Sequence, residues 1–122
     1  MANQRGFARH ERVAGLLRRE LAVLIQRQLK DPEVGFISVS DVEVSRDLAH
    51  AKVFVTVGVD EDPQTCVGAL NRAAGFLRTQ LGRQLRLRST PALKFLHDTS
   101  IETGAHMEAL LASVQADHQE EE

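Results

Sequence analysis

Hydrophobic residues recur at helical spacing from about residue 8 to residue 30, which predicts a first helix. One side of the helical wheel gathers the residues expected to pack: Val13, Leu16, Leu17, Leu21 and Leu24. The opposite side carries Arg12, Arg19 and Lys30, and Arg5 would continue this arc if the helix extended that far. The dipeptide Asp31-Pro32 predicts the end of the helix, because proline disfavours a helical preceding residue and has no N–H donor.

Two segments with alternating hydrophobic residues follow and predict an antiparallel hairpin. In residues 36–44 the parity of the hydrophobic positions changes once, so we expect a β-bulge near Ser40 or Asp41. After a short turn, residues 49–59 alternate strictly. The expected inner face of this second strand consists of Ala51, Val53, Val55, Val57 and Val59.

Asp62-Pro63 predicts the start of a second helical region, since an acceptor side chain at the cap is followed by proline at the first helical position. Arg78 falls on the apolar stripe of an unbroken helix, and Gly75 lies within the pattern at a cost of about 1 kcal/mol relative to alanine. A kink at Ala73-Ala74-Gly75 would move Arg78 towards solvent. The alternative is one straight helix with a tolerated glycine and an arginine that extends its charged end to water.

Pro91 ends this region, and residues 92–98 predict a third strand. A capping box at residues 99–102 introduces a last helix with an apolar face made of Met107, Leu110, Leu111 and Val114. The order is helix, hairpin, broken helix, strand and helix. It predicts an α+β two-layer sandwich with the helices on one face of a mainly antiparallel, three-stranded sheet. Residues 1–116 are expected to form one domain, and residues 117–122 an acidic disordered tail.

Charge is segregated along the chain, although the formal net charge is only −2. Residues 1–30 hold seven Lys or Arg against two acids, and residues 72–94 hold six against none. A segregated cationic surface is typical of proteins that bind polyanions. One such block would more simply be a solvated helix face, but two blocks without compensating acids favour binding.

No constellation of residues points to catalysis, a metal or a cofactor. The five histidines lack metal-ligand spacing, and no glycine pattern matches a phosphate-binding loop. The lone Cys66 favours a small core residue rather than a nucleophile. There is no Trp or Tyr, and Phe36, Phe54, Phe76 and Phe95 mostly fall at positions that a core could absorb, so a base-stacking sheet is not expected.

The longest uninterrupted aliphatic run has five residues, from Leu21 to Ile25, too short for a membrane span of roughly 20 residues. The single cysteine favours a reducing compartment, so we expect a cytoplasmic protein. No coiled-coil seam calls for a dimer, and a monomer is expected.

Several motifs are similar to those of the bacterial ribosome-binding factor A family and lie within roughly residues 9–104. They include Leu29-Lys30-Asp31-Pro32-Glu33-Val34-Gly35, Ser45-Arg46-Asp47-Leu48-Ala49-His50-Ala51-Lys52-Val53 and Ala73-Ala74-Gly75-Phe76-Leu77-Arg78. The resemblance implies a type II KH-like fold in which an Ala-x-Gly kink, here Ala73, Ala74 and Gly75, replaces the usual glycine-rich loop. It also implies a maturation factor that binds the immature 30S small ribosomal subunit and its 16S rRNA, assists processing of the rRNA 5′ end and supports growth in the cold. Maturation GTPases are possible further partners.

The residues expected to face rRNA phosphates come from both cationic blocks: Arg5, Arg12, Arg19, Lys30, Arg72, Arg78, Arg83, Arg86 and Arg88. Arg46, at the predicted hairpin turn, either extends this surface or pairs with Asp47 or Glu43. Two other classes stay open. An enzyme that cleaves rRNA would need an acid–base or metal cluster, and a protein-binding adaptor would keep its binding at high salt.

Overall fold

The computed structural model describes residues 8–100. Its elements are α1 (Arg9–Gln28), β2 (Ile37–Val44), β3 (His50–Val57), α2 (Pro63–Arg72), α3 (Ala74–Leu85) and β4 (Ala92–His97). This order confirms the expected helix, hairpin, broken helix and strand. The predicted last helix, the tail 117–122 and Arg5 lie outside the described residues.

The three strands form one sheet in the order β2-β3-β4. β2 pairs antiparallel with β3, and the register shifts between Val39 and Asp41, which leaves Ser40 as the extra residue and confirms the predicted bulge. β4 pairs parallel with β3, so the sheet is mixed rather than mainly antiparallel. The parallel pair arises because the chain crosses over through α2 and α3 before it returns to the sheet.

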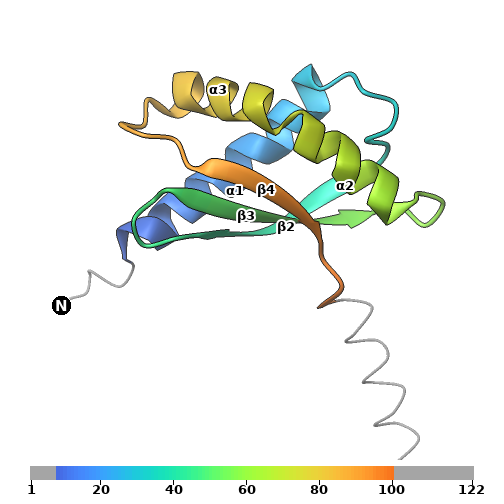
Figure 1. The fold of residues 1–122 in the computed structure, drawn as a ribbon, viewed down its shortest axis with the longest axis horizontal. Coiled ribbons are helices and arrows are strands. Elements are labelled where there is room, and N and C mark those ends of the chain that lie inside the picture. The colour runs from blue at the N-terminus through green and yellow to red at the C-terminus, as the bar shows by residue number, and fades with distance from the viewer. Residues whose placement is uncertain (1–7, 101–122) are drawn as a thin grey trace, which may run out of the picture.

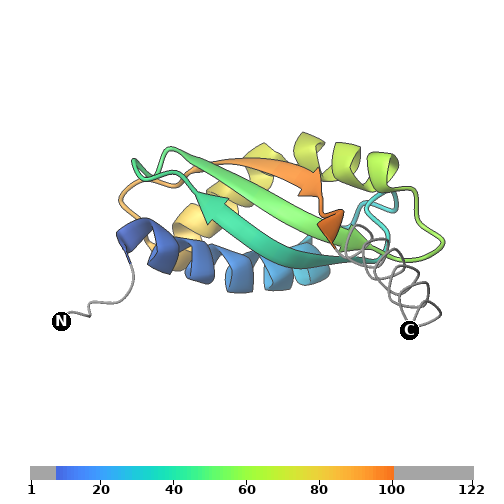
Figure 2. The ribbon, with the colours of Figure 1, turned by 90° about the horizontal axis from the view of Figure 1, so that it is seen from below.

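All three helices cover one face of the sheet (Figure 1), and in Figure 2 the strands cross in front of α3. The inner face of the sheet is apolar and buried: Val39, Val42, Val44, Ala51, Val53, Val55 and Phe95. The helices pack fully buried leucines on it: Leu17, Leu21, Leu70, Leu77 and Leu81. Residues of the opposite parity, such as Lys52 and Lys94, are exposed on the open face. The result is the predicted α+β two-layer sandwich.

Some residues near the edges of the predicted pattern lie outside the core. Leu16 is 38% exposed, because it falls beyond the edge of the buried stripe of α1. α1 ends two residues before Lys30, and Leu29 has an extended conformation, so Lys30 is not on the helical row of cations. β3 ends two residues before Val59, which is fully exposed.

The long helical region is broken at Ala73, as predicted. Ala73 separates α2 from α3, with φ of −89° and ψ of 0°. Its N–H donates to the carbonyls of both Ala69 and Leu70 at 3.1 Å. Beyond the break Leu77 is fully buried while Arg78 is exposed, so the straight-helix alternative is wrong.

Asn71 fixes the end of α2 to the sheet. Its Oδ1 accepts the N–H of Phe95 at 2.8 Å, and its Nδ2 donates to the Phe95 carbonyl at 3.1 Å. Both bonds reach the outer edge of β4, which pairs with β3 on its other side. This side chain therefore sets where the helix break lies relative to the sheet.

Candidate nucleic-acid interface

The second half of α3 and the loop that follows it carry a group of exposed cations. Arg83 lies in the last turn of α3, Arg86 is its C-cap residue, and Arg88 lies in the loop before β4. The Nε of Arg78 donates to the carbonyl of Thr90 at 2.9 Å, which holds this loop against the helix. Arg78 therefore has a structural partner, whereas the side chains of the other three make no hydrogen bond or ion pair within the described residues.

The hairpin turn with Arg46 lies beside this loop, because the first residue of β4 donates its N–H to the carbonyl of Ala49 at 2.9 Å. The carboxylate of Asp47 accepts the Ser45 hydroxyl at 2.6 Å and the Ala49 N–H at 3.0 Å. These hydrogen bonds lower the pKa of Asp47. In the described part of the chain Arg46 is exposed and forms no ion pair with Asp47 or Glu43, so the paired alternative is wrong.

The first half of α1 adds Arg12 and Arg19, which lie two turns apart on the solvent side of the helix. α1 and α3 contact each other, and in Figures 1 and 2 the start of α1 and the end of α3 lie toward the same end of the molecule. An open hollow of about 480 Å³ is lined by Glu11, Arg12, Gly15, Leu16 and Arg19. We call Arg12, Arg19, Arg46, Arg83, Arg86 and Arg88 the basic surface.

Arg86 has a backbone conformation that favours glycine. Its φ of 51° and ψ of 41° are left-handed, and its N–H closes α3 by donating to the Gly82 carbonyl at 3.1 Å. This conformation costs a residue with a Cβ about 1 kcal/mol relative to glycine. The other non-glycine residue with positive φ in residues 8–100, Leu48, packs its side chain on the core. Since the side chain of Arg86 is exposed, no packing in the described residues offsets its cost.

Two of the predicted cations lie in acidic surroundings. The Nη2 of Arg72 is 3.0 Å from Oε1 of Glu33, and this ion pair is exposed. Lys30 directly precedes Asp31 beyond the end of α1, which is about 30 Å long. Lys30 therefore lies at the opposite end of that helix from Arg12 and does not join the basic surface.

The helix break is open to solvent at Gly75. A Cβ built there would meet nothing within 4 Å, so packing does not require glycine at this position. The backbone N–H groups at the break donate to the carbonyls of Ala69, Leu70 and Asn71. Most backbone N–H groups at the break are therefore not available to a ligand. What a ligand could approach is the backbone around the Cα of Gly75, which no side chain of the described residues covers.

Two aromatic predictions are wrong. Phe95 is fully buried and Phe54 is half-buried, but Phe36 is 85% exposed and Phe76 is 45% exposed. Phe36 lies just before β2, and Phe76 lies in the first turn after the helix break. The short-range hydrophobic pattern did not distinguish these ends of elements from the core.

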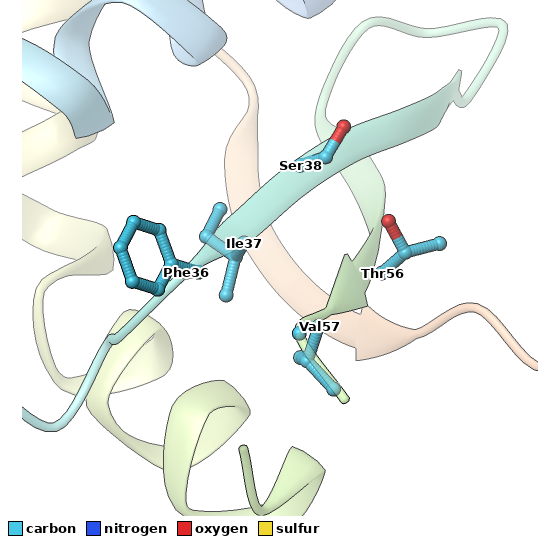
Figure 3. Close-up of a pocket in the computed structure, with 6 residues that line it drawn as sticks. Phe36, Ile37, Ser38, Thr56 and Val57 are labelled. Atoms are coloured by element: carbon cyan, nitrogen blue, oxygen red, sulfur yellow. The ribbon is translucent and has the colours of Figure 1, made fainter. Parts of the chain in front are cut away.

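Other features of residues 8–100 give no sign of catalysis. Cys66 is buried, and burial raises the pKa of its thiol, which makes it a core residue. An open hollow of about 280 Å³ lies at the start of β2 and the end of β3 (Figure 3), and no ionisable side chain lines it. The described part of the chain contains no group of three or more potential metal ligands and no helix that could cross a membrane.

The model of the family described as ribosome-binding factor A matches residues 9–111. The chain belongs to this family. It is 50% identical over 119 residues to ribosome-binding factor A of Alkalilimnicola ehrlichii, an alignment that covers 95% of this chain and 92% of the relative.

Solved structures of the family share the fold. The crystal structure of ribosome-binding factor A from Thermus thermophilus has a TM-score of 0.65 at 32% identity, covering 72% of this chain and 94% of that one. A model of the Thermus thermophilus factor fitted into a cryo-EM map of its 30S complex has a TM-score of 0.62 at 32% identity, covering 77% and 97%. The chain therefore has the KH-like fold that the sequence motifs implied.

Proposed function

We propose that this protein binds the immature small ribosomal subunit through phosphates of its 16S rRNA and assists late maturation, including processing of the rRNA 5′ end. Membership of the family and the 30S complex of the Thermus thermophilus factor support this partner. The observation that carries the proposal is the run of residues 72–94, which has six cations and no acid and exposes Arg83, Arg86 and Arg88 together.

The chemistry of this surface suits RNA backbone. An arginine can donate two parallel hydrogen bonds to one phosphate, and several arginines around α3 would hold one RNA conformation. The proposed role is to bind and release the RNA rather than to cleave it, and the described residues contain no group of three or more potential metal ligands that a metal-dependent nuclease would use. As a partner of ribosomal subunits, the protein would work in the cytoplasm.

A pair of charge reversals tests the location of the interface. Arg83→Glu with Arg88→Glu removes two cations that have no partner within the described residues, unlike Arg78, which anchors the loop. We expect co-sedimentation with immature small subunits to fall by at least about tenfold, with unchanged circular dichroism and thermal unfolding. Lys30→Glu is the matched control, because Lys30 lies away from the basic surface, and it should bind within about twofold of the parent. Equal losses in both variants would contradict the assigned location.

Salt dependence tests the kind of partner. About six phosphate contacts predict that the affinity falls roughly 10³-fold between about 50 and 200 mM salt. Binding that survives high salt would instead indicate a protein-docking adaptor and would contradict phosphate recognition. An rRNA-cleaving enzyme would be indicated if the purified protein alone cleaved precursor rRNA.

A further inference from the structure

Phe76 presents an aromatic ring where the fold does not need one. It is 45% exposed in the first turn of α3, while the next residue, Leu77, is fully buried. An isolated exposed hydrophobic residue is common on protein surfaces. The surroundings of Phe76 distinguish it from such a residue.

The ring lies next to bare backbone and on the same face of α3 as an exposed arginine. It directly follows Gly75, where an added Cβ would meet nothing within 4 Å, so the backbone just before the ring is open to solvent. Arg83 lies two helical turns further along the same helix and therefore on the same face. Arg72, one residue before the break, already pairs with Glu33, while residues 72–94 themselves contain no acid.

We infer that Phe76 stacks on an unpaired nucleobase of the bound RNA. This inference rests on the proposed function, since it assumes that RNA phosphates lie on the neighbouring arginines. A phenylalanine ring offers no hydrogen-bond donor or acceptor, but every base has a π-face, so the contact would be strong without selecting one base. RNA-binding proteins take hold of unstacked bases with aromatic rings in this way.

Phe36 is a second exposed phenylalanine, but it lies in an acidic environment. It is 85% exposed, yet its N–H donates to Oε2 of Glu61 at 2.9 Å, and Asp60 and Asp62 flank that acid. This negative environment repels phosphate. Phe36 is therefore the internal control for an exposed phenylalanine that RNA does not contact.

The absence of Trp and Tyr from the chain makes a direct test possible. Phe76→Trp places the sole indole fluorophore at the proposed contact. Phe36→Trp places it beside Glu61, in the acidic surroundings of Phe36. Each full-length variant is titrated at low salt with a single-stranded oligoadenylate of about 12 nucleotides, a length within the site size of single-strand binders. A stacked base quenches indole emission, so we expect saturable quenching for Phe76→Trp and none for Phe36→Trp.

A second measurement uses the natural partner. Phe76→Leu keeps an apolar side chain but removes the π-face, and we expect its affinity for immature small subunits to fall roughly tenfold with unchanged thermal unfolding. Phe76→Tyr should retain the parent affinity, because the ring is kept.

Several outcomes would overturn the inference. The first is equal quenching of indole emission in Phe76→Trp and Phe36→Trp. The second is unchanged emission of Phe76→Trp while labelled RNA still binds to it. The third is a blue shift of Phe76→Trp emission without quenching when small subunits are added, which would place the ring against protein. In all three cases the phosphate-binding proposal stands if the Arg83/Arg88 reversals still abolish binding. If the parent protein binds neither RNA nor subunits, the proposed function fails as well.

Discussion

The molecule has an acidic end around Gly35 and Glu61 and a basic end around α3 and the loop after it. Both ends contain residues with an unusual backbone conformation. At the acidic end, Gly35 has a φ of +63°, and an added Cβ there would overlap with the carboxylate of Glu61. Glu61 in turn accepts the N–H of Phe36, and the carboxylate of Asp31 accepts the N–H of Glu33 at 2.9 Å. At this end the backbone of Gly35 and the N–H of Phe36 therefore have partners within the fold, whereas the side chains of Phe36 and Val59 are exposed.

The basic end lacks such internal explanations. An added Cβ at Gly75 would meet no protein atom, and Arg86 has a glycine-like backbone conformation although its side chain is exposed. Phe76 is half exposed, whereas the next residue, Leu77, is fully buried. Around α3 and the loop after it, the left-handed backbone of Arg86 and the open position of Gly75 thus have no explanation in the packing of the described residues. Because conformational cost persists where function requires it, the backbone of Arg86 supports the proposed binding surface independently of charge.

The largest expected difference between the ends comes from two glycine-to-alanine substitutions. Gly35→Ala should lower the free energy of unfolding by about 1–2 kcal/mol, because alanine disfavours the positive φ and displaces the carboxylate end of Glu61. Urea denaturation measures this change. Binding per folded molecule should be unaffected, since Gly35 lies at the acidic end.

Gly75→Ala is the matched substitution at the basic end. It should raise the free energy of unfolding by up to about 1 kcal/mol, because alanine is the better helix former and meets no protein atom. If RNA backbone approaches this bare position, subunit binding should fall by about tenfold. A variant that is both more stable and fully active would show that nothing approaches Gly75.

An intermediate effect is expected at Arg86. Arg86→Gly should raise the free energy of unfolding by about 1 kcal/mol by relieving the left-handed backbone, and reduce the magnitude of the salt-dependence slope by about one. Arg86→Asn separates the two causes, because asparagine tolerates this conformation but carries no charge. Unchanged affinity in both variants would remove Arg86 from the interface.

The smallest effect concerns Asp98, which follows β4 at the acidic end. Hydrogen bonds from Ser100 and then from the Ser40 hydroxyl, at 2.5 Å, lower the pKa of Asp98 to about 2. The lowered pKa means that the ionised form stabilises the fold above about pH 4, and that this contribution is lost as the pH falls through about 2. Ser40→Ala should raise the pKa of Asp98 part of the way towards 3.8, as measured by NMR titration. An unchanged value would assign the shift to Ser100 alone.

Local patterns in the sequence predicted the local features of the fold. The change of parity in β2 predicted the bulge at Ser40, and the conflict between Gly75 and Arg78 predicted the helix break. Both signals arise within a few residues, where alternation or helical spacing has a definite phase. The same patterns failed for Phe76, because the phase of a helix is not defined in the first turn after a break.

Pairs of polar side chains from distant parts of the chain could not be predicted. Asn71 reaches Phe95 over 24 residues, and Arg72 reaches Glu33 over 39. Such pairs depend on the assembled tertiary structure and leave no periodic signal. For the site, the sequence therefore identified the cationic segments, but only the fold separated Lys30 and Arg72 from the basic surface.

The hydrogen bonds of Asn71 have a consequence for the protein in concentrated solution. β4 is an outer strand, and such strands offer unpaired N–H and C=O groups on which another chain can add a strand. The amide of Asn71 already satisfies both backbone groups of Phe95 at the middle of that strand. A single side chain thereby hinders edge-to-edge aggregation on this side of the sheet.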